Sequence, residues 1–392
     1  MSRSVFEVFT GAMVRYARWF IFSVLPGAHT NAPLGFRRLG LVLLFPFFLA
    51  LQLVHWVAFL VDELCFPGYR RVSVKEPVFI IGIPRSGTTY LHRELAANPR
   101  FTTVSTWEAL LAPAVCERKL LGVLRAIDKG FGGHLRRLIL RLSGTVSSGL
   151  DSIHPVRLDA PEEDYLLLLP AGACSFLLVV FPFDSWLLRL ADFGALSTKE
   201  RKQLVRFYHA MLQKHLYCQG ENDRLLSKNA AFSGWAGSLQ QQYPDAEFIV
   251  CIRSPVTALS SQLSALKPAR RIFGTDRSGD WTRETFNLLF SSYYTALGEF
   301  MASRPPPEAL VLDQADLRHN GSSVENTLAR RFSLRAPAAS PVTSKAVAGL
   351  KTTDAHVYDA NSLGVSIDGI SKGAHAAYKN LLQHPMRIGA SR

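Results

Sequence analysis

The segment at residues 78–99 reads VFIIGIPRSGTTYLHRELAANP and carries the residue types of an anion-binding loop. A short β-branched and aromatic run predicts a buried strand, and Gly82 and Gly87 then repeat the glycine spacing of a phosphate-binding loop. Glycine permits the positive φ angles that turn backbone N–H groups toward a ligand. The lysine that should follow the second glycine is missing, and the loop's cation is Arg85 instead. The pattern therefore favours an anion other than a nucleoside triphosphate held with magnesium.

Hydroxyl groups surround this arginine. Ser86, Thr88 and Thr89 add O–H donors, and the Arg85 guanidinium can donate two hydrogen bonds to anionic oxygens. The residues that follow have helical spacing, so the loop leads into a helix N-terminus, whose unpaired N–H groups and dipole favour an anion. A glycine-rich turn without a ligand is the alternative, but it leaves the coincidence of strand, glycines, arginine and hydroxyls unexplained.

A second candidate anion site follows the apolar strand expected at residues 248–252. Arg253 comes at the carboxyl end of this strand, where ligands of open α/β sheets bind. Ser261 lies about two helical turns further on, so its hydroxyl can face the same side as the arginine. An arginine after a strand is by itself more often an ordinary surface residue. Together with the first loop, it indicates a second, separate phosphate site.

The sequence PRSGTT after an apolar strand, followed far downstream by a strand, an arginine and a serine, resembles the sulfotransferases that use 3′-phosphoadenosine 5′-phosphosulfate (PAPS). In those enzymes the first loop binds the 5′-phosphosulfate, and the later arginine and serine bind the 3′-phosphate. The resemblance implies that the donor is bound by Arg85, Ser86, Gly87, Thr88, Thr89, Arg253 and Ser261. It covers about residues 78–334 and is strongest toward bacterial and tyrosylprotein sulfotransferases. Such a donor needs neither the loop lysine nor magnesium, so we expect no metal.

A lysine that could act in the transfer follows in LLSKNAAF, residues 225–232, where Lys228 ends a strand-like run. This segment resembles the one in which related sulfotransferases hold a lysine beside the bridging oxygen of the donor. A cation suits that place because negative charge develops on the leaving phosphate oxygen as the S–O bond breaks. A solvated surface lysine is the alternative interpretation.

The acceptor hydroxyl also requires a group that takes its proton. Glu108, in STWEALLAP, stands two residues away from the place where tyrosylprotein sulfotransferases carry a glutamate. His154 is the alternative, because imidazole titrates near neutral pH and an acidic cluster follows it at residues 162–164. We expect Glu108 to be the base and keep His154 as the second candidate. His92, on the helix after the loop, is more typical of a packed or solvated histidine.

The N-terminal region is of a different kind. Residues 39–61 read LGLVLLFPFFLALQLVHWVAFLV, carry no formal charge and are long enough to cross a bilayer. Residues 5–25 mix apolar and basic side chains as an interfacial helix does. A helical hairpin buried against the catalytic domain is the alternative. We expect membrane association with the catalytic domain on the cytoplasmic side, whereas a single crossing would place that domain in a lumen or outside.

The elements that must position these residues form, on this prediction, an α/β fold with a P-loop-like parallel sheet flanked by helices and preceded by the membrane-associated helical segment. We divide the chain into that segment at 1–66, a catalytic domain at 72–334, and a C-terminal loop and helix at 335–392 packed on it. The 392 residues are 48% hydrophobic, which supports a sizeable core.

Charge and composition narrow the possible functions. The net charge of +13 suits a nucleotide with two anionic groups or an anionic membrane surface, and Arg270 and Arg271 could form a lid over such a nucleotide. Zinc spacing and long basic runs are absent, which argues against nucleic-acid binding. We therefore predict a sulfotransferase that moves a sulfuryl group from PAPS to a hydroxyl of a hydrophobic or lipidic acceptor. Apolar residues at 174–188 could line the acceptor cleft or belong to the core. The alternative function is a membrane-associated, kinase-like nucleotide-binding protein without transfer chemistry, and the sequence leaves the oligomeric state open.

Overall fold

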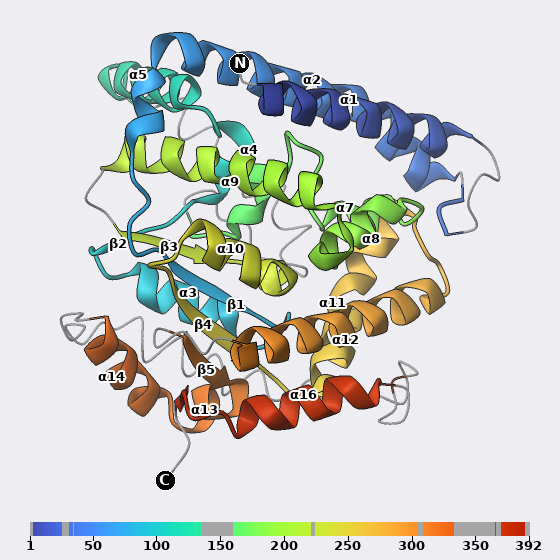
Figure 1. Cartoon of the computed structure of the whole chain (residues 1–392). Helices are drawn as coiled ribbons and strands as arrows, with labels where there is room; N and C mark the ends of the chain where they lie inside the picture. Colours follow the sequence, from blue (N-terminus) through green and yellow to red (C-terminus); the bar gives the residue numbers. More distant parts are fainter. Residues whose placement is uncertain are drawn as a thin grey trace.

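The computed structural model describes residues 3–25, 31–33, 35–132, 134, 160–220, 224–303, 309–332, 365 and 370–388. Within these ranges the chain is an α/β protein, rich in helix, with a six-stranded parallel sheet in the order β2-β3-β1-β4-β5-β6 (Figure 1). The strands are β1 (Val78–Gly82), β2 (Phe101–Thr102), β3 (Arg224–Lys228), β4 (Glu247–Ile252), β5 (Ala309–Asp313) and β6 (Arg387–Ile388). The predicted parallel α/β sheet is confirmed.

Helices cover both faces of this sheet, which is why its central strands are continuous apolar runs. The α-helices after the N-terminal pair are α3 (Thr88–Ala96), α4 (Thr106–Leu111), α5 (Val115–Gly130), α7 (Leu177–Val180), α8 (Ser185–Ala191), α9 (Thr198–Gln219), α10 (Ala236–Gln242), α11 (Pro255–Phe273), α12 (Asp280–Ser303), α13 (Gln314–His319), α14 (Gly321–Arg331) and α16 (Lys372–Leu382). Four short 3₁₀ segments join them: η1 (Pro67–Arg71), η2 (Asp164–Leu168), η3 (Phe193–Ala195) and η4 (Ala230–Trp235).

Alternate strand residues face two hydrophobic cores, as the pleat of a strand requires. Val78 and Ile80 of β1 pack in a core with α3, α13 and α14, whereas Phe79 and Ile81 pack in a larger core with α9, α10 and α12. The β1 and β4 backbones pair side by side from Val78 to Gly82, so the ends of both strands open at the same edge of the sheet. This edge is where both predicted anion sites begin.

Two long N-terminal helices, α1 (Arg3–Val24) and α2 (Phe36–Cys65), lie as an outer layer over α9 (Figure 1). The predicted apolar segment is confirmed as helix and continues past Pro46. Among the described residues, one stretch, Arg38–Cys65, is long and apolar enough to cross a membrane, judged by length and composition. Tyr16 and Trp19 of α1 are fully buried in the larger core, so this layer is packed against the body of the protein.

The C-terminal part returns to the sheet. Helix α16 packs along α12, and β6 pairs in parallel with β5. Most of the loop predicted before this helix lies outside the described residues. The domain boundaries stay predictions.

Candidate active site

The loop between β1 and α3 depends on its two glycines. Gly82 has a φ of 143°, and a Cβ built there would lie 2.0 Å from the carbonyl oxygen of Cys251 in β4. Gly87, with a φ of 91°, stands as the N-cap of α3 in the left-handed region. The Ile83 N–H donates a hydrogen bond of 2.9 Å to the same Cys251 carbonyl, which joins the loop to the end of β4. The glycine spacing seen in the sequence is therefore a requirement of this turn.

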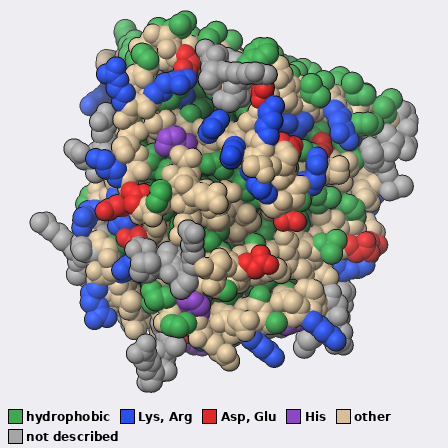
Figure 2. Space-filling view, in the orientation of Figure 1, with side chains coloured by type: hydrophobic (Ala, Val, Ile, Leu, Met, Phe, Trp, Pro, Cys, Tyr) green, Lys and Arg blue, Asp and Glu red, His purple; other side chains and the backbone are tan. Residues whose placement is uncertain are grey.

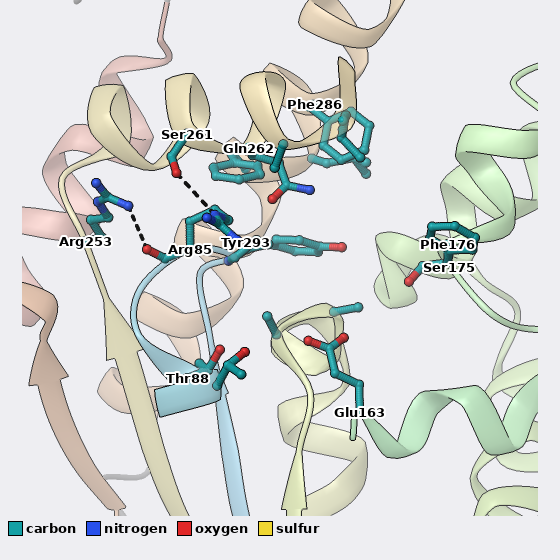
Figure 3. A pocket seen from close by; sticks show the side chains of 18 of the residues that line it. Arg85, Thr88, Glu163, Ser175, Phe176, Arg253, Ser261, Gln262, Phe286 and Tyr293 are labelled. Atoms are coloured by element: carbon teal, nitrogen blue, oxygen red, sulfur yellow. Dashed lines mark hydrogen bonds between the residues drawn. The ribbon is translucent and has the colours of Figure 1, made fainter. Parts of the chain in front are cut away.

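Arg85 joins the two predicted anion sites. Its φ of 69° is unusual for a residue with a side chain, and such strain is found mainly where surrounding contacts enforce it. Arg253 Nη1 donates a hydrogen bond of 2.9 Å to the Arg85 carbonyl, and Gln314 Nε2 donates one of 3.3 Å to the same oxygen. Arg85 Nε in turn donates a hydrogen bond of 3.2 Å to Ser261 Oγ (Figure 3). Residues from two distant parts of the chain thus form one cationic cluster at the carboxyl ends of β1 and β4.

The hydroxyl groups predicted to serve this loop differ in their surroundings. Thr88 and Thr89, in the first turn of α3, line a cavity beside Arg85. Ser86 is fully buried, and its Oγ has no hydrogen-bond partner among the described residues. A buried hydroxyl without a partner is costly, and an oxyanion bound in the loop would supply the missing acceptor. The Ser86 hydroxyl without a partner is therefore consistent with a bound nucleotide that places an anionic group at this loop.

The cavity has a volume of about 810 Å³ and two ends of opposite character. Its polar end is lined by Arg85, Gly87, Thr88, Thr89, Arg253 and Ser261. Its apolar end is lined by Phe176, Leu178, Val179, Leu266, Phe286, Leu289 and Phe290. Glu163 and Tyr293 extend into the space between the two ends from opposite walls (Figure 3). Six residues predicted to bind the donor thus share one cavity, and part of the predicted acceptor segment forms its far wall.

Lys228 lies just behind this cavity. It ends β3, only 2% of its side chain is exposed, and its Nζ forms a hydrogen-bonded ion pair with Oε1 of Glu163. Glu163 precedes η2, whose first residue, Asp164, accepts a hydrogen bond of 2.5 Å from Tyr208. Burial raises the pKa of Asp164 to about 7. Lys228 therefore contacts the cavity through Glu163, which lines it.

Glu108 takes a different place from the one predicted. It is buried in the capping box of α4, where Oε2 accepts hydrogen bonds from the Ser105 backbone N–H at 2.8 Å and from Ser105 Oγ at 2.7 Å. Its Oε1 accepts from Arg118 Nη1 at 3.1 Å and from Gln219 Nε2 at 2.8 Å. Burial acts to raise the pKa of Glu108, but hydrogen bonding to His215 and the charge of Arg118 outweigh it, so the pKa lies well below its ordinary value. Glu108 does not line the cavity, and its contacts make it a structural anchor, which argues against the predicted role as base.

The remaining residues that the sequence analysis named lie outside this cavity or outside the described part of the chain. His154 lies outside the described residues. His92 is buried, bonds through Nε2 to Thr103 Oγ1 at 2.7 Å, and has a pKa lowered to about 3 by burial and by the nearby charges of Lys228 and Arg93. It is a packed, neutral histidine. The pair at residues 270–271 does not cover this cavity but lines a separate pocket against the start of α2.

Two polar residues that extend into the middle of the cavity, Glu163 and Tyr293, were not singled out from the sequence. Glu163 belonged to the acidic cluster noted beside His154, and this cluster was a usable signal. Tyr293 sits in the long helix α12, where aromatic residues recur at core positions, and nothing local distinguishes it.

The comparisons with known proteins agree with this geometry. The model of the sulfotransferase family matches residues 77–320, which is more than half of the chain and contains both anion-binding segments. The chain therefore belongs to the sulfotransferase family, and the sequence-based identification of the family is confirmed.

Two solved structures with a similar fold come from mycobacteria. The sulfotransferase STF1 from Mycobacterium tuberculosis matches with a TM-score of 0.65 at 17% identity, covering 95% of this chain and 92% of that one. The sulfotransferase STF9 from Mycobacterium avium matches with a TM-score of 0.64 at 15% identity, covering 96% and 95%. At these identities the likeness is one of fold. No curated protein sequence matches the chain.

Proposed function

We propose that the protein transfers a sulfuryl group from PAPS to the hydroxyl of a hydrophobic alcohol or phenol. The observation that carries this proposal is the cavity itself, in which a cationic, hydroxyl-rich end and an apolar end meet near the carboxylate of Glu163, with Glu162 beside it. Its volume of about 810 Å³ is in the range of small-molecule sites, and a nucleotide occupies much of such a space. Only the reactive end of a long acceptor then enters.

The donor's two anionic parts have separate binding groups on this proposal. The backbone N–H groups of the loop, the hydroxyls of Ser86, Thr88 and Thr89, and the Arg85 guanidinium bind the 5′-phosphosulfate. Arg253 and Ser261 bind the 3′-phosphate. The hydrogen bond between Arg85 and Ser261 supports this arrangement, because it keeps the two subsites adjacent, as one nucleotide bearing both anions requires.

The transfer step follows from the position of the ion pair. The acceptor oxygen attacks sulfur and forms the new O–S bond, while the bond between sulfur and the 5′-phosphate oxygen breaks. The acceptor proton passes to the Glu163 carboxylate, and adenosine 3′,5′-bisphosphate leaves. Once Glu163 is protonated, its attraction for Lys228 weakens, and the Lys228 ammonium is available for the charge that develops on the leaving oxygen.

The apolar end suits a hydrophobic acceptor. Phe176, Leu178 and Val179 form one wall, and Phe286 and Phe290 of α12 belong to the other side. Such side chains exclude water from the reacting hydroxyl and contribute affinity in proportion to the apolar area buried. Ser175, Gln262 and Tyr293 are the polar groups within reach of this end. A sugar would leave most of its hydroxyl groups without partners there.

We also propose membrane association through the N-terminal helices. The length and apolar composition of α2 support it. The cytoplasmic placement of the catalytic domain stays a prediction.

Thermal stabilisation by nucleotides tests the donor. Adenosine 3′,5′-bisphosphate should raise the melting temperature strongly, and ATP should raise it little, because stabilisation follows the ratio of ligand concentration to dissociation constant. Equal stabilisation by the two would sink the proposal and favour a kinase-like nucleotide-binding protein. Transfer itself is tested with ³⁵S-labelled PAPS and a total lipid extract, compared with water-soluble metabolites. Label confined to the water-soluble fraction would remove the hydrophobic acceptor.

A further inference from the structure

The outer surface of α1 and α2 is largely apolar, although Arg18 of α1 is exposed as well. We call it the N-terminal face, and its largest exposed side chains on α2 are Phe36, Leu43, Leu44, Phe47, Val57 and Leu64. Phe6, Val14 and Ile21 continue it on α1. Figure 2 shows hydrophobic side chains gathered along the upper rim of the molecule, where these helices lie. Soluble monomers rarely expose a continuous apolar surface of this extent, so something covers it.

The inner side of α2 is held to the protein by buried polar groups. Asp62 accepts hydrogen bonds from Lys214 Nζ at 2.6 Å and from the backbone N–H groups of Val115 and Cys116 at 2.8 Å each. Nearer the middle of the helix, His55 Nδ1 bonds to a carboxylate oxygen of Glu117 at 2.7 Å. A crossing of the bilayer by α2 would break the Asp62–Lys214 pair and leave two uncompensated charges, one of them in lipid. These contacts favour a helix that stays on the protein and presents one side to the lipid.

A basic pocket lies at the N-terminal end of this face. It has a volume of about 530 Å³ and is lined by Phe36, Lys267, Arg270, Arg271, Asp276 and Arg277. Asp276 is engaged by Arg270 Nη1 at 3.0 Å, which leaves the pocket with an excess of positive charge from Lys267 and Arg277, both exposed. Phe36, with 92% of its surface exposed, stands at the same pocket. An apolar anchor beside clustered cations matches the boundary between acyl chains and anionic head groups.

We propose that the N-terminal face docks flat on an anionic phospholipid bilayer, with α2 parallel to the membrane plane and lipid phosphate in the basic pocket. The 30 residues of α2 make a helix about 45 Å long, and among its described side chains the exposed stripe from Phe36 to Leu64 carries no charge. An apolar stripe of this length suits a helix that lies in the membrane–water interface with one side inserted among the lipids. The inference concerns location and does not rest on the proposed chemistry.

Docking in this orientation places the acceptor end of the cavity toward the lipid. Arg38, in the first turn of α2, donates a hydrogen bond of 2.7 Å to the Val180 carbonyl of α7, and Thr275 Oγ1 donates one of 2.9 Å to the Val179 carbonyl. Val179 lines the catalytic cavity, while Arg38 and Thr275 line the basic pocket. One turn of α7 therefore separates the apolar end of the cavity from the docking surface.

Vesicle flotation with the full-length protein tests the apolar part of the face. Protein purified in mild detergent is mixed with vesicles of phosphatidylcholine, with or without phosphatidylglycerol, and the detergent is removed. Phe47→Glu should reduce flotation by about tenfold or more, because one buried aromatic side chain contributes at least that factor. Leu288→Glu on α12 is the matched control, since both side chains are 73% exposed, and it should float as the unsubstituted protein does. Equal loss in both variants, or in neither, would overturn the proposal.

The basic pocket is tested by charge reversal. Lys267→Glu should weaken binding to phosphatidylglycerol vesicles by about fivefold or more and leave binding to phosphatidylcholine unchanged. Arg330→Glu on α14, at the opposite end of the molecule from α2 (Figure 1), is the control and should have no effect. If inorganic phosphate releases the protein from phosphatidylglycerol vesicles at the same millimolar concentration at which phosphate binds the protein in solution, the pocket recognises free phosphate and the lipid assignment fails.

Depth measurements distinguish docking from crossing. Nitroxide-lipid quenching of fluorophores on Phe36→Cys, Phe47→Cys and Leu64→Cys, in a background with Cys65, Cys116 and Cys218 changed to serine, should give three similar, shallow depths. Depths graded across the bilayer would show a spanning helix. A stoichiometric dimer in buffer that Phe47→Glu dissociates, combined with no flotation of the unsubstituted protein, would instead make the face an interface between copies. Either result overturns the proposal.

Discussion

Replacing Glu163 with glutamine tests the assignment of the base. Glutamine has the same shape and keeps an oxygen toward Lys228, but it cannot accept the acceptor's proton. General-base catalysis contributes about 10²–10⁴-fold to a rate, so kcat should fall by that factor, which corresponds to about 3–5 kcal/mol of activation free energy. Affinity for adenosine 3′,5′-bisphosphate should change little, because its anion contacts come from the clusters around Arg85 and Arg253.

Glu108→Gln provides the comparison, because it makes the same chemical change at a buried glutamate outside the cavity. It removes a carboxylate that Arg118 contacts at 3.1 Å in the interior, and the arginine then lacks its counter-charge. Removing one member of a buried pair costs about 3 kcal/mol of unfolding free energy. The variant should therefore melt at a lower temperature, while kcat per folded molecule stays close to that of the unsubstituted protein.

Single-turnover transfer from ³⁵S-labelled PAPS separates these effects, with melting temperature and nucleotide affinity measured on the same preparations. The reasoning is refuted if Glu163→Gln keeps kcat within about threefold, or if Glu108→Gln abolishes transfer without lowering the melting temperature. The second outcome would restore the base predicted from the sequence.

Three further predictions concern the donor site, the loop and the fold. Arg253→Ala should weaken binding of adenosine 3′,5′-bisphosphate by about 2 kcal/mol and leave nucleotides without a 3′-phosphate unaffected in isothermal titration; an unchanged preference would exclude this role. Gly82→Ala should prevent folding or cost on the order of 4 kcal/mol, because its Cβ would lie 2.0 Å from the Cys251 carbonyl oxygen, and a normal urea midpoint would contradict the clash. The Asp164 pKa is raised to about 7, above its unfolded value, so its contribution to stability is present below about pH 4 and is lost as pH rises toward 7. Asp164→Asn should flatten this dependence, by about 2 kcal/mol between pH 5 and pH 7 in urea unfolding, and an equally steep profile would contradict it.

The structural parts of the proposed donor site could be predicted from the sequence because they are local. A strand, a turn with two required glycines and a helix N-terminus follow one another within residues 78–96, and their chemistry is set by that order. Arg253 was found by the general rule that ligands of parallel sheets bind at the carboxyl ends of strands. Its neighbour across the cluster, Arg85, could be anticipated because β1 and β4 lie side by side in such folds.

The proposed base, Glu163, could not be predicted in the same way, because its position depends on packing between distant segments. Glu108 is close to the loop in the chain, yet α4 directs it toward Arg118 and Gln219. The sequence did hold a warning, since Ser105 followed three residues later by glutamate is the pattern of a capping box. Glu163 reaches the cavity because its segment packs against the end of β3, a contact between residues 65 positions apart.

In the same way, hydropathy alone could not show whether α2 crosses a membrane or packs against the protein. Length and apolar composition are alike for a crossing helix and for one that is half-buried, and the difference lies in where the polar side chains find their partners. Asp62 pairs with Lys214, which is 152 residues away in the chain, and His55 pairs with Glu117. The residues next to Asp62 and His55 in the sequence give no signal that indicates these partners.

The distribution of charge and apolar surface around the cavity links the chemistry to the membrane face. Cationic groups gather at the ends of β1 and β4, where they would attract the proposed anionic donor, while α7 and α12 line the cavity mainly with apolar side chains. On the proposed function, an acceptor with one hydroxyl and a long apolar body would satisfy both surroundings, because its hydroxyl would meet Glu163 and its body would remain among apolar side chains. Since α7 also carries the carbonyl that Arg38 of α2 binds, the same short helix lines the apolar end of the cavity and contacts the N-terminal helix layer. An acceptor dissolved in the bilayer would then reach the reacting carboxylate without passing through water, which is the arrangement that favours a hydrophobic substrate over a soluble one.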